Sequence, residues 1–473
     1  MKRRWIGLIV AGGLVAASFG SAVNAFAATS TGADPGFGIV TGYDLELTGT
    51  TPYESGMRKS YDSLVNGNQI VFENGTYSDE LVDFDEYGEY YALRTKSYDE
   101  EVNATGFFSA DGEQLIPYEA AFVKWVSIKV GEGEKYFPHR YLSVVYSDGV
   151  AEDESEAYFY LTASYLSLSP GEDDVLYKGH EKIYDTVTRQ FVPNIELTDP
   201  SFDVYECGDA IVIDRNGAIT MYDANGKELL SSEDGTYNSG YNHVGNGILI
   251  LKSGQKYKVY DDTGKQLFES DEDMTVVESV RGYVKQYDSG LYTIFDSSGK
   301  QVLDQKFKTV YEESGSYLSV ETDKEAAQLV SLDGKVIAEN DDIFNFYTYS
   351  YGFVTEEKDE TYSLYGPSGL LDEGLTSASP YLIYTYNDGS FLALNTGEKI
   401  AIEPGTSFAD SIGVVGLLLV HDDTSGLYGL YDAFTGEQLL DCNYRFLSAS
   451  ATHVYAMKDD TWEIYSLNPI FSK

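Results

Sequence analysis

The sequence has few cysteines, few histidines and few positive charges. Its 473 residues include two Cys and five His, and 32 Lys and Arg stand against 77 Asp and Glu, for a formal net charge of −45. A surface this acidic repels phosphate backbones, which excludes nucleic acid as a partner. No His lies at zinc-ligand spacing from another His or from a Cys, so the sequence predicts no zinc site.

Long apolar runs are absent after the first 27 residues. The chain begins with a basic stretch from Lys2 to Arg4, an apolar run rich in Gly and Ala, and the small residues Ala25 and Ala27. This order predicts a bacterial signal peptide over 1–27, cleaved after Ala27, although an uncleaved anchor helix is the alternative. Cleavage would leave a secreted, extracellular protein without membrane insertion. Loss of the three basic residues would change the net charge from −45 to −48.

The two cysteines, Cys207 and Cys442, do not settle their own pairing. Export would permit one disulfide. The two residues fall at different phases of the repeat described below. The sequence therefore leaves open whether they form a bridge or remain free.

No stretch shows a sustained 3.6-residue apolar pattern, but one short phrase recurs along the chain. It reads VYDDTGKQLF at 259–268, MYDANGKELL at 221–230, IFDSSGKQVL at 294–303 and LYDAFTGEQLL at 430–440. Intervals of 38, 35, 35 and 35 residues separate the glycines of successive copies, which are Gly226, Gly264, Gly299, Gly334 and Gly369. Self-similarity at this period indicates a repeat architecture.

Each repeat has the plan of short strands separated by tight turns. The unit at 283–303 has three such strands, rich in aromatic and β-branched residues. We therefore expect an all-β fold, a β-propeller of antiparallel repeats of ~35–40 residues with about seven to eight or more blades. An open β-solenoid is the alternative. The last copy, 453–468, stops after two strands, which predicts that an N-terminal strand completes the final blade.

The predicted organisation is a signal peptide at 1–27, an N-terminal segment at 28–60 and a propeller domain at 61–473. An acidic insertion near 148–176 interrupts one repeat with Glu152, Asp153, Glu154 and Glu156. A solvated loop is the first interpretation of such a charge run. A cation site or a partner-binding loop is the second.

The repeat resembles that of WG-repeat proteins. The stretch 105–119, TGFFSADGEQLIPYE, matches a strand that opens with Gly and an aromatic residue, continues into an Asp-Gly turn and ends in an apolar-Pro pair. The matching residues are Gly106, Phe107, Phe108, Asp111, Gly112, Ile116 and Pro117, and Tyr428-Gly429 keeps an aromatic-Gly pair. The chain is thus similar to a degenerate, secreted bacterial β-propeller repeat protein. Such a resemblance implies a structure and no reaction.

The echoed Asp-Gly turn has two interpretations. Asp and Asn oxygens beside Gly are typical of calcium loops, but an EF-hand needs ligands at positions 1, 3, 5 and 12. Here a strand with a Lys follows Gly264 directly. A hairpin turn explains every residue, because Asp can bond to the backbone two residues on and Gly can take the left-handed conformation. We therefore expect no cofactor, with calcium as the alternative.

Catalysis has no clear signature. With 77 Asp and Glu, some carboxylate pair is inevitable and so uninformative. The arginines that remain as candidates to bind carboxylates are Arg94, Arg140, Arg189, Arg215, Arg281 and Arg445.

Tyrosines give the strongest indication of binding. The chain has 41 Tyr, and two aromatic runs fall at comparable places in successive repeats. The candidate ligand-binding residues are Tyr347, Tyr349, Tyr351, Tyr384 and Tyr386. In an extended strand the members of each run share one face and would offer rings and hydroxyls to a ligand. Packing between blades is the alternative.

The sequence thus favours an exported, non-catalytic module that binds a protein, peptide or glycan. A propeller-fold glycoside hydrolase or polysaccharide lyase is the second hypothesis. A structural protein of the cell envelope is the third.

Overall fold

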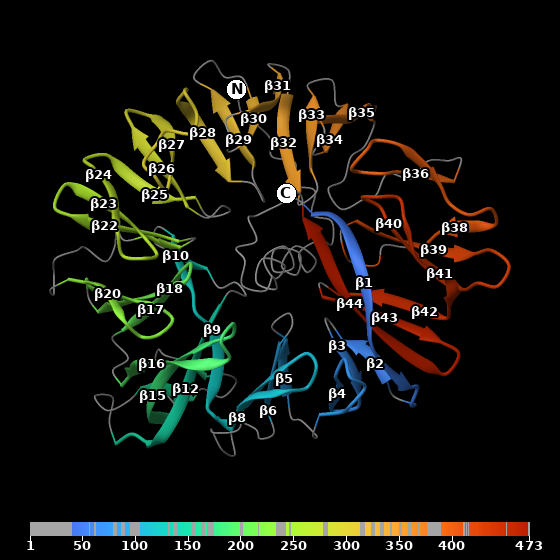
Figure 1. Ribbon diagram of the computed structural model, residues 1–473, viewed down its shortest axis with the longest axis horizontal. Helices are drawn as coiled ribbons and strands as arrows, with labels where there is room; N and C mark the ends of the chain where they lie inside the picture. The colour runs from blue at the N-terminus through green and yellow to red at the C-terminus, as the bar shows by residue number, and fades with distance from the viewer. Residues whose placement is uncertain are drawn as a thin grey trace, which may run out of the picture.

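The fold is a ring of β-sheets. The computed structural model describes residues 40–471 apart from several internal segments, the longest of which are 95–104, 233–242 and 376–388. The described strands form ten sheets, and paired neighbours run antiparallel. In Figure 1 the sheets follow one another around a common axis in chain order. The predicted all-β propeller is confirmed.

We number the described strand groups as blades 1 to 11 in chain order. Blade 1 contains β2(Met57–Ser60), β3(Ser63–Asn66) and β4(Gln69–Val71), and blade 2 contains β5(Asp83–Glu86), β6(Tyr90–Arg94), β7(Thr105–Ser109) and β8(Gln114–Ala120). Blade 3 contains β9(Phe122–Trp125), β12(Tyr141–Val150), β15(Val175–Asp185) and β16(Gln190–Leu197). Blade 4 contains β17(Asp203–Cys207), β18(Ala210–Arg215), β19(Ala218–Tyr222) and β20(Glu228–Ser231). Blade 5 contains β21(His243–Gly245), β22(Ile248–Ser253), β23(Lys256–Asp261) and β24(Gln266–Ser270). Blade 6 contains β25(Asp273–Val276), β26(Tyr283–Asp288) and β27(Leu291–Asp296). Blade 7 contains β28(Phe307–Glu312), β29(Tyr317–Thr322), β30(Ala327–Ser331) and β31(Val336–Asn340). Blades 6 and 7 count as one sheet because Tyr292 pairs with Phe307.

The remaining blades complete the ring. Blade 8 contains β32(Ile343–Tyr349), β33(Gly352–Glu357), β34(Tyr362–Gly366) and β35(Gly369–Leu375), and blade 9 contains β36(Ser390–Leu392) and β37(Lys399–Ala401). Blade 10 contains β38(Thr406–Phe408), β39(Leu417–Asp422), β40(Tyr428–Asp432) and β41(Gln438–Tyr444). Blade 11 contains β42(Phe446–Ala449), β43(His453–Lys458), β44(Thr461–Phe471) and β1(Val40–Pro52). Four further strands lie outside this plan: β10(Ile128–Val130), β11(Gly133–Lys135), β13(Phe159–Leu161) and β14(Leu166–Ser167).

Blade 11 combines the two ends of the described chain. Strand β1 pairs with β44 from Val40 opposite Phe471 to Pro52 opposite Thr461. The prediction that an N-terminal strand completes the final blade is confirmed. Trp462 of blade 11 then packs with Leu64 of blade 1, so the ring closes, which decides for a propeller over an open solenoid.

The segment at 28–60, which the sequence sets apart from the repeat, supplies both β1 and β2. The propeller therefore includes residues 40–60. This stretch lacks the recurring Asp-Gly turn. The reason is that β1 is the outer strand of blade 11, whose other three strands come from the C-terminal end of the chain.

Apolar clusters between neighbouring blades form the core. Strands such as β9 alternate half-buried and buried residues, so each blade presents apolar side chains on a face that meets its neighbour. One cluster joins Tyr141 and Ile183 of blade 3 to Ile211 and Ile213 of blade 4. The next joins Val212 of blade 4 to Leu249 of blade 5.

The echoed turn fills the gap between one blade and the next. Gly226 of blade 4 has φ +69°, and a Cβ there would stand 1.8 Å from the carbonyl oxygen of Pro193 on the outer strand of blade 3. Gly264 of blade 5 meets Leu229 of blade 4 in the same way. Only glycine combines this conformation with so close an approach. The repetition of the phrase thus follows from the repetition of the blade junction.

Candidate functional site

The predicted tyrosine site lies mostly outside the described residues. Tyr347 and Tyr349 are on β32, where they pair with Val354 and Gly352 of β33 and share one face of the strand. Their side chains are not described. Tyr351, Tyr384 and Tyr386 lie outside the described residues. All five remain a prediction.

In blades 4 to 6 the turn aspartate bonds to its own turn. One carboxylate oxygen of Asp261, Oδ1, accepts the backbone N–H groups of Thr263 and Lys265, both at 3.0 Å. The same pattern recurs at Asp223 and at Asp296. The predicted bond from Asp to the backbone two residues on is therefore confirmed. Among the described residues, no group of three or more His, Cys, Asp or Glu is arranged to hold a metal ion.

In blades 3 and 10 the turn is one residue longer and its aspartate is buried. Asp432 is 1 % exposed, and Gly436, which has φ +82°, follows it by four residues instead of three. The backbone N–H of Tyr43 on β1 donates to Asp432 Oδ2 at 3.0 Å, whereas that of Phe434 donates to Oδ1. Burial raises the pKa of Asp432, although these hydrogen bonds oppose the shift. This aspartate thus holds the closing strand.

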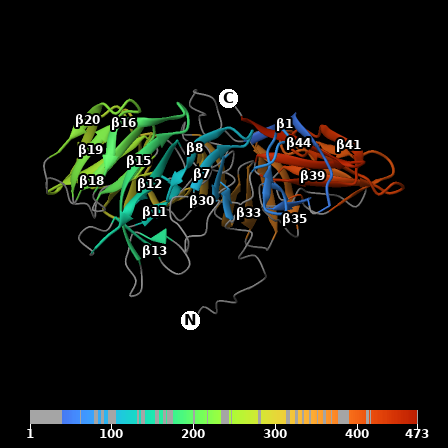
Figure 2. The same cartoon turned by 90° about the horizontal axis from the view of Figure 1, so that it is seen from below.

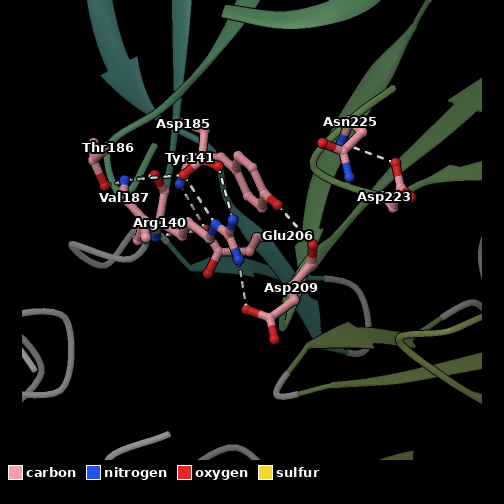
Figure 3. A network of polar contacts seen from close by, with 9 residues as sticks. All are labelled: Arg140, Tyr141, Asp185, Thr186, Val187, Glu206, Asp209, Asp223 and Asn225. Atoms are coloured by element: carbon pink, nitrogen blue, oxygen red, sulfur yellow. Dashed lines mark hydrogen bonds and ion pairs between the residues drawn. The ribbon is translucent and has the colours of Figure 1, made fainter. Parts of the chain in front are cut away.

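The corresponding aspartate of blade 3, Asp185, binds Arg140. The guanidinium donates from Nε to Oδ1 at 2.9 Å and from its second terminal nitrogen to Oδ2 at 2.8 Å. Its other terminal nitrogen donates to Asp209 of blade 4 at 2.7 Å (Figure 3). Arg189 takes the left-handed position of this turn, with φ 54°, where blade 10 has Gly436. The Arg140 network therefore joins blade 3 to blade 4.

Glu206 on β17 lies on the other side of Arg140. Its Oε2 accepts the backbone N–H groups of Arg140 and Tyr141 at 3.1 and 3.2 Å, and its own N–H donates to Ser127 at 2.8 Å. Burial raises the pKa of Glu206 to about 8, although the two N–H donors oppose the shift. Between Ser127 and Arg140 the chain leaves blade 3 and forms β10 and β11; we call this stretch the β10–β11 excursion. Glu206 therefore fixes both ends of the excursion to blade 4.

This network brings together the residue types of a hydrolytic site, but its groups are occupied. Asp185 is fully buried and accepts two bonds from Arg140, and Glu206 is 6 % exposed. A general acid or base must reach a substrate proton within hydrogen-bond distance. Because these carboxylates bind the chain itself, the network is suited to fixing two blades together.

The acidic insertion is partly a sheet. Strands β12 and β15 run on as a hairpin, with Val150 opposite Tyr177, and β13 and β14 add to the edge of β15. The insertion therefore contains strands on both sides of the charge run, which the solvated-loop interpretation did not predict. Glu152 is described and exposed, whereas Asp153, Glu154 and Glu156 lie outside the described residues. Figure 2 shows β13 beyond β12 and β15 at one face of the ring.

Tyr158 anchors this insertion. The residue is 4 % exposed, its hydroxyl donates to Glu181 at 3.1 Å, and its ring packs with Ala121 and Val145. Val150, which pairs with Tyr177 at the level of this anchor, is 63 % exposed. The insertion thus has a fixed base on blade 3, beside which the described residues Val150 and Glu152 are exposed.

An aromatic patch continues along the same hairpin. The ring of Tyr146 stacks on that of His180 with centroids 5.1 Å apart and planes at 14°. The ammonium of Lys182 lies 5.7 Å from the Tyr146 ring, and Asp148 lies 2.9 Å from Nδ1 of His180. The ring centroid of Phe191 lies 6.4 Å from that of Tyr146. Half-buried rings beside polar groups are typical of ligand-binding surfaces.

Sequence reasoning did not single out these residues. Arg140 was one of six arginine candidates, and only the loss of glycine from the turn at 185–189 distinguished its partner. No disulfide joins Cys207 to Cys442. No helix in the described part of the chain has the length and apolar character of a membrane span.

No protein-family model and no curated protein matches the chain. The resemblance to WG-repeat proteins therefore remains a prediction. Among solved structures, the chain is similar to a eukaryotic initiation factor, at 10% identity and a TM-score of 0.37, with 90% of this chain and 99% of that chain covered. It is also similar to BamB from Moraxella catarrhalis, at 9% identity, a TM-score of 0.27 and coverage of 91% and 100%. Hsv2 from Kluyveromyces lactis matches at 12% identity, a TM-score of 0.29 and coverage of 63% and 99%. The architecture itself, a closed ring of antiparallel blades, places the chain among the β-propellers.

Proposed function

We propose that the chain is an exported, non-catalytic propeller scaffold that binds a protein, peptide or glycan through the extended hairpin of blade 3. The observation that carries the proposal is this hairpin, which Tyr158 anchors and which continues past the blade to exposed Val150. Function usually lies in the segments that a rigid scaffold holds out to solvent.

The chemistry of the hairpin supports a binding role. The aromatic patch of Tyr146 and His180 lies on the same two strands, with Lys182 and Asp148 beside it. Rings, a cation and an anion within one surface suit a ligand that has both apolar and hydrogen-bonding groups. The Tyr run of β32 is the second proposed contact surface, and export rests on the leader at 1–27.

A deletion tests this proposal. The mature protein and a variant in which a short Gly-Ser turn replaces 151–174 are applied to glycan and peptide arrays. We expect the deletion to weaken the hits that the intact protein gives, because it removes β13 and β14 but leaves Tyr146 and His180, while a thermal melt shows that the variant still folds. Retention of every hit by the deletion variant would contradict the hairpin as the binding surface.

Product analysis on the same hits separates the alternatives. Turnover of a bound glycan would establish the hydrolase or lyase hypothesis, whereas binding without products supports a scaffold. A melt with and without millimolar calcium tests the metal alternative. We expect no shift, because one oxygen of each short-turn aspartate already binds backbone N–H groups.

A further inference from the structure

Blades 10 and 11 meet at a cluster of two tyrosines and one glutamate. Tyr444 ends β41, while Glu463 and Tyr465 lie two residues apart on one face of β44. The hydroxyls of Tyr444 and Tyr465 lie 2.9 and 2.7 Å from Glu463 Oε2 and 2.9 Å from each other. Tyr444 is 6 % exposed, whereas Glu463 and Tyr465 are half-buried at the edge of the junction.

The cluster holds a preorganised carboxylate. Two phenol groups direct their hydroxyls at one oxygen, and hydrogen bonds to an ionised acceptor are the stronger kind. Burial, and then the neighbouring carboxylate, raise the pKa of Tyr465, so its hydroxyl stays protonated. The two hydroxyls therefore hold the Glu463 carboxylate in position while part of it faces solvent.

An ammonium of the chain already lies on this cluster. Lys458 Nζ stands 5.8 Å from the centroid of the Tyr444 ring, within the range of a cation–π contact. Lys458 is exposed, so its long side chain can leave the ring at little cost. The chain as a whole has a net charge of −45, which attracts cations to its surface.

We propose that the Tyr444–Glu463–Tyr465 cluster binds the ammonium group of a lysine side chain in a basic peptide, in exchange for Lys458. The ring of Tyr444 offers its face and Glu463 offers the opposite charge, and the ammonium of Lys458 already occupies the position over this ring. The site lies across the ring from the blade 3 hairpin (Figure 1) and does not depend on the function proposed for it.

The probe is a capped Gly-Lys-Gly peptide, titrated by calorimetry, with the N-acetyllysine peptide as its neutral counterpart. We expect Glu463→Gln to weaken binding about tenfold, equivalent to one paired charge, and the acetylated peptide not to bind. Glu398→Gln is the matched control, because it removes the same charge from an exposed position on blade 9. It should change the affinity less than about twofold.

Lys458→Met is the decisive variant. Removing the resident ammonium should strengthen binding about threefold, whereas Lys265→Met, which removes an exposed charge from blade 5, should leave it unchanged. Lys458 is exposed, so this variant stays informative even if Glu463→Gln disturbs the junction. Equal losses in Glu463→Gln and Glu398→Gln, or unaltered affinity in Lys458→Met, would overturn the proposal. So would binding of a neutral hexasaccharide at this cluster without binding of the lysine peptide.

Discussion

The turns of blades 5 and 10 begin with the same Tyr-Asp pair but use the aspartate differently. In blade 5, Asp261 bonds to the turn that it opens, and the left-handed glycine follows after three residues. In blade 10 the glycine follows after four residues, Asp432 is buried and the backbone of Tyr43 binds to it. Blade 3 also has the longer turn, and there Asp185 binds Arg140.

The difference separates two kinds of blade junction. A short turn supplies a corner and a glycine that packs on the previous blade, and it can be repeated anywhere in the ring. A long turn supplies a buried carboxylate, and in both blades it receives a segment that departs from the repeat: the closing strand β1 in blade 10, and the return of the β10–β11 excursion in blade 3. The irregular parts of the ring are therefore fixed by charge and hydrogen bonds.

Removing the partner of a buried turn aspartate should have the largest effect. Arg140→Met keeps most of the apolar stem but leaves Asp185 buried without its counter-ion, which costs about 3–5 kcal/mol of unfolding free energy. Urea unfolding at neutral pH measures the loss. Arg189→Met is the control, because its ion pair with Glu113 is exposed and contributes less than about 1 kcal/mol. Equal losses would show that the buried pair has no special role.

Substitution of the glycine in a short turn should destabilise the protein through a steric clash. Gly226→Ala would place a Cβ 1.8 Å from the carbonyl oxygen of Pro193, so blades 3 and 4 would have to separate. We expect a loss of about 3 kcal/mol from strain and lost packing. Gly254→Ala has a similar φ of +66° but nothing within 4 Å of the new Cβ, so it isolates the backbone cost of about 1 kcal/mol. A loss no larger at Gly226 would contradict the packing role of the turn.

The regular junctions could be predicted from the sequence because they repeat. Each copy of Asp-x-x-Gly reports the same local geometry, so the phrase at 259–268 predicted both its turn and its place in a propeller. Closure was predictable for a similar reason, since a final unit of two strands needs a partner from elsewhere. Residues 40–60 were not assigned to the propeller, because β1 pairs with β44, which begins at Thr461 near the other end of the chain, and β1 carries no recurring turn.

The irregular junctions could not be predicted, because their residues meet only in three dimensions. Arg140 and Asp185 lie 45 residues apart, and Glu206 is 66 residues from Arg140. Nothing in the local sequence distinguishes Glu463 from other acidic residues until Tyr444 is placed beside it. The spacing from Asp to the left-handed residue was the one visible signal, three in the short turns and four in the long ones.

The free energy of unfolding should depend on pH through Glu206 at the junction of blades 3 and 4. Its pKa rises from the ordinary 4.5 to about 8 on folding, so the folded state favours the protonated form. Stability from this group is therefore present at low pH and lost as pH rises from about 4.5 to 8. Glu206→Gln removes this loss, so the unfolding free energy of the variant should exceed that of the wild type by several kcal/mol above pH 8 and match it near pH 4. Denaturation at several pH values, with Glu398→Gln as control, tests this; a constant difference would contradict it.

The smallest effect should come from how each aspartate divides its hydrogen bonds. Asp432 uses both oxygens, one for Tyr43 and one for Phe434, whereas Asp296 accepts Ser298 and Lys300 with Oδ1 alone. Asparagine has a single carbonyl oxygen. Asp432→Asn must therefore lose one bond and about 1 kcal/mol, while Asp296→Asn can keep both of its bonds.

Amide hydrogen exchange locates this loss. Faster exchange confined to β1 in Asp432→Asn, with unchanged exchange in Asp296→Asn, is the expected result. It would mean that a long turn protects a distant strand, whereas a short turn protects only itself. Similar exchange in the two variants would show that the buried carboxylate of blade 10 does not hold the ring closed, and that the pairing of β1 with β44 is sufficient.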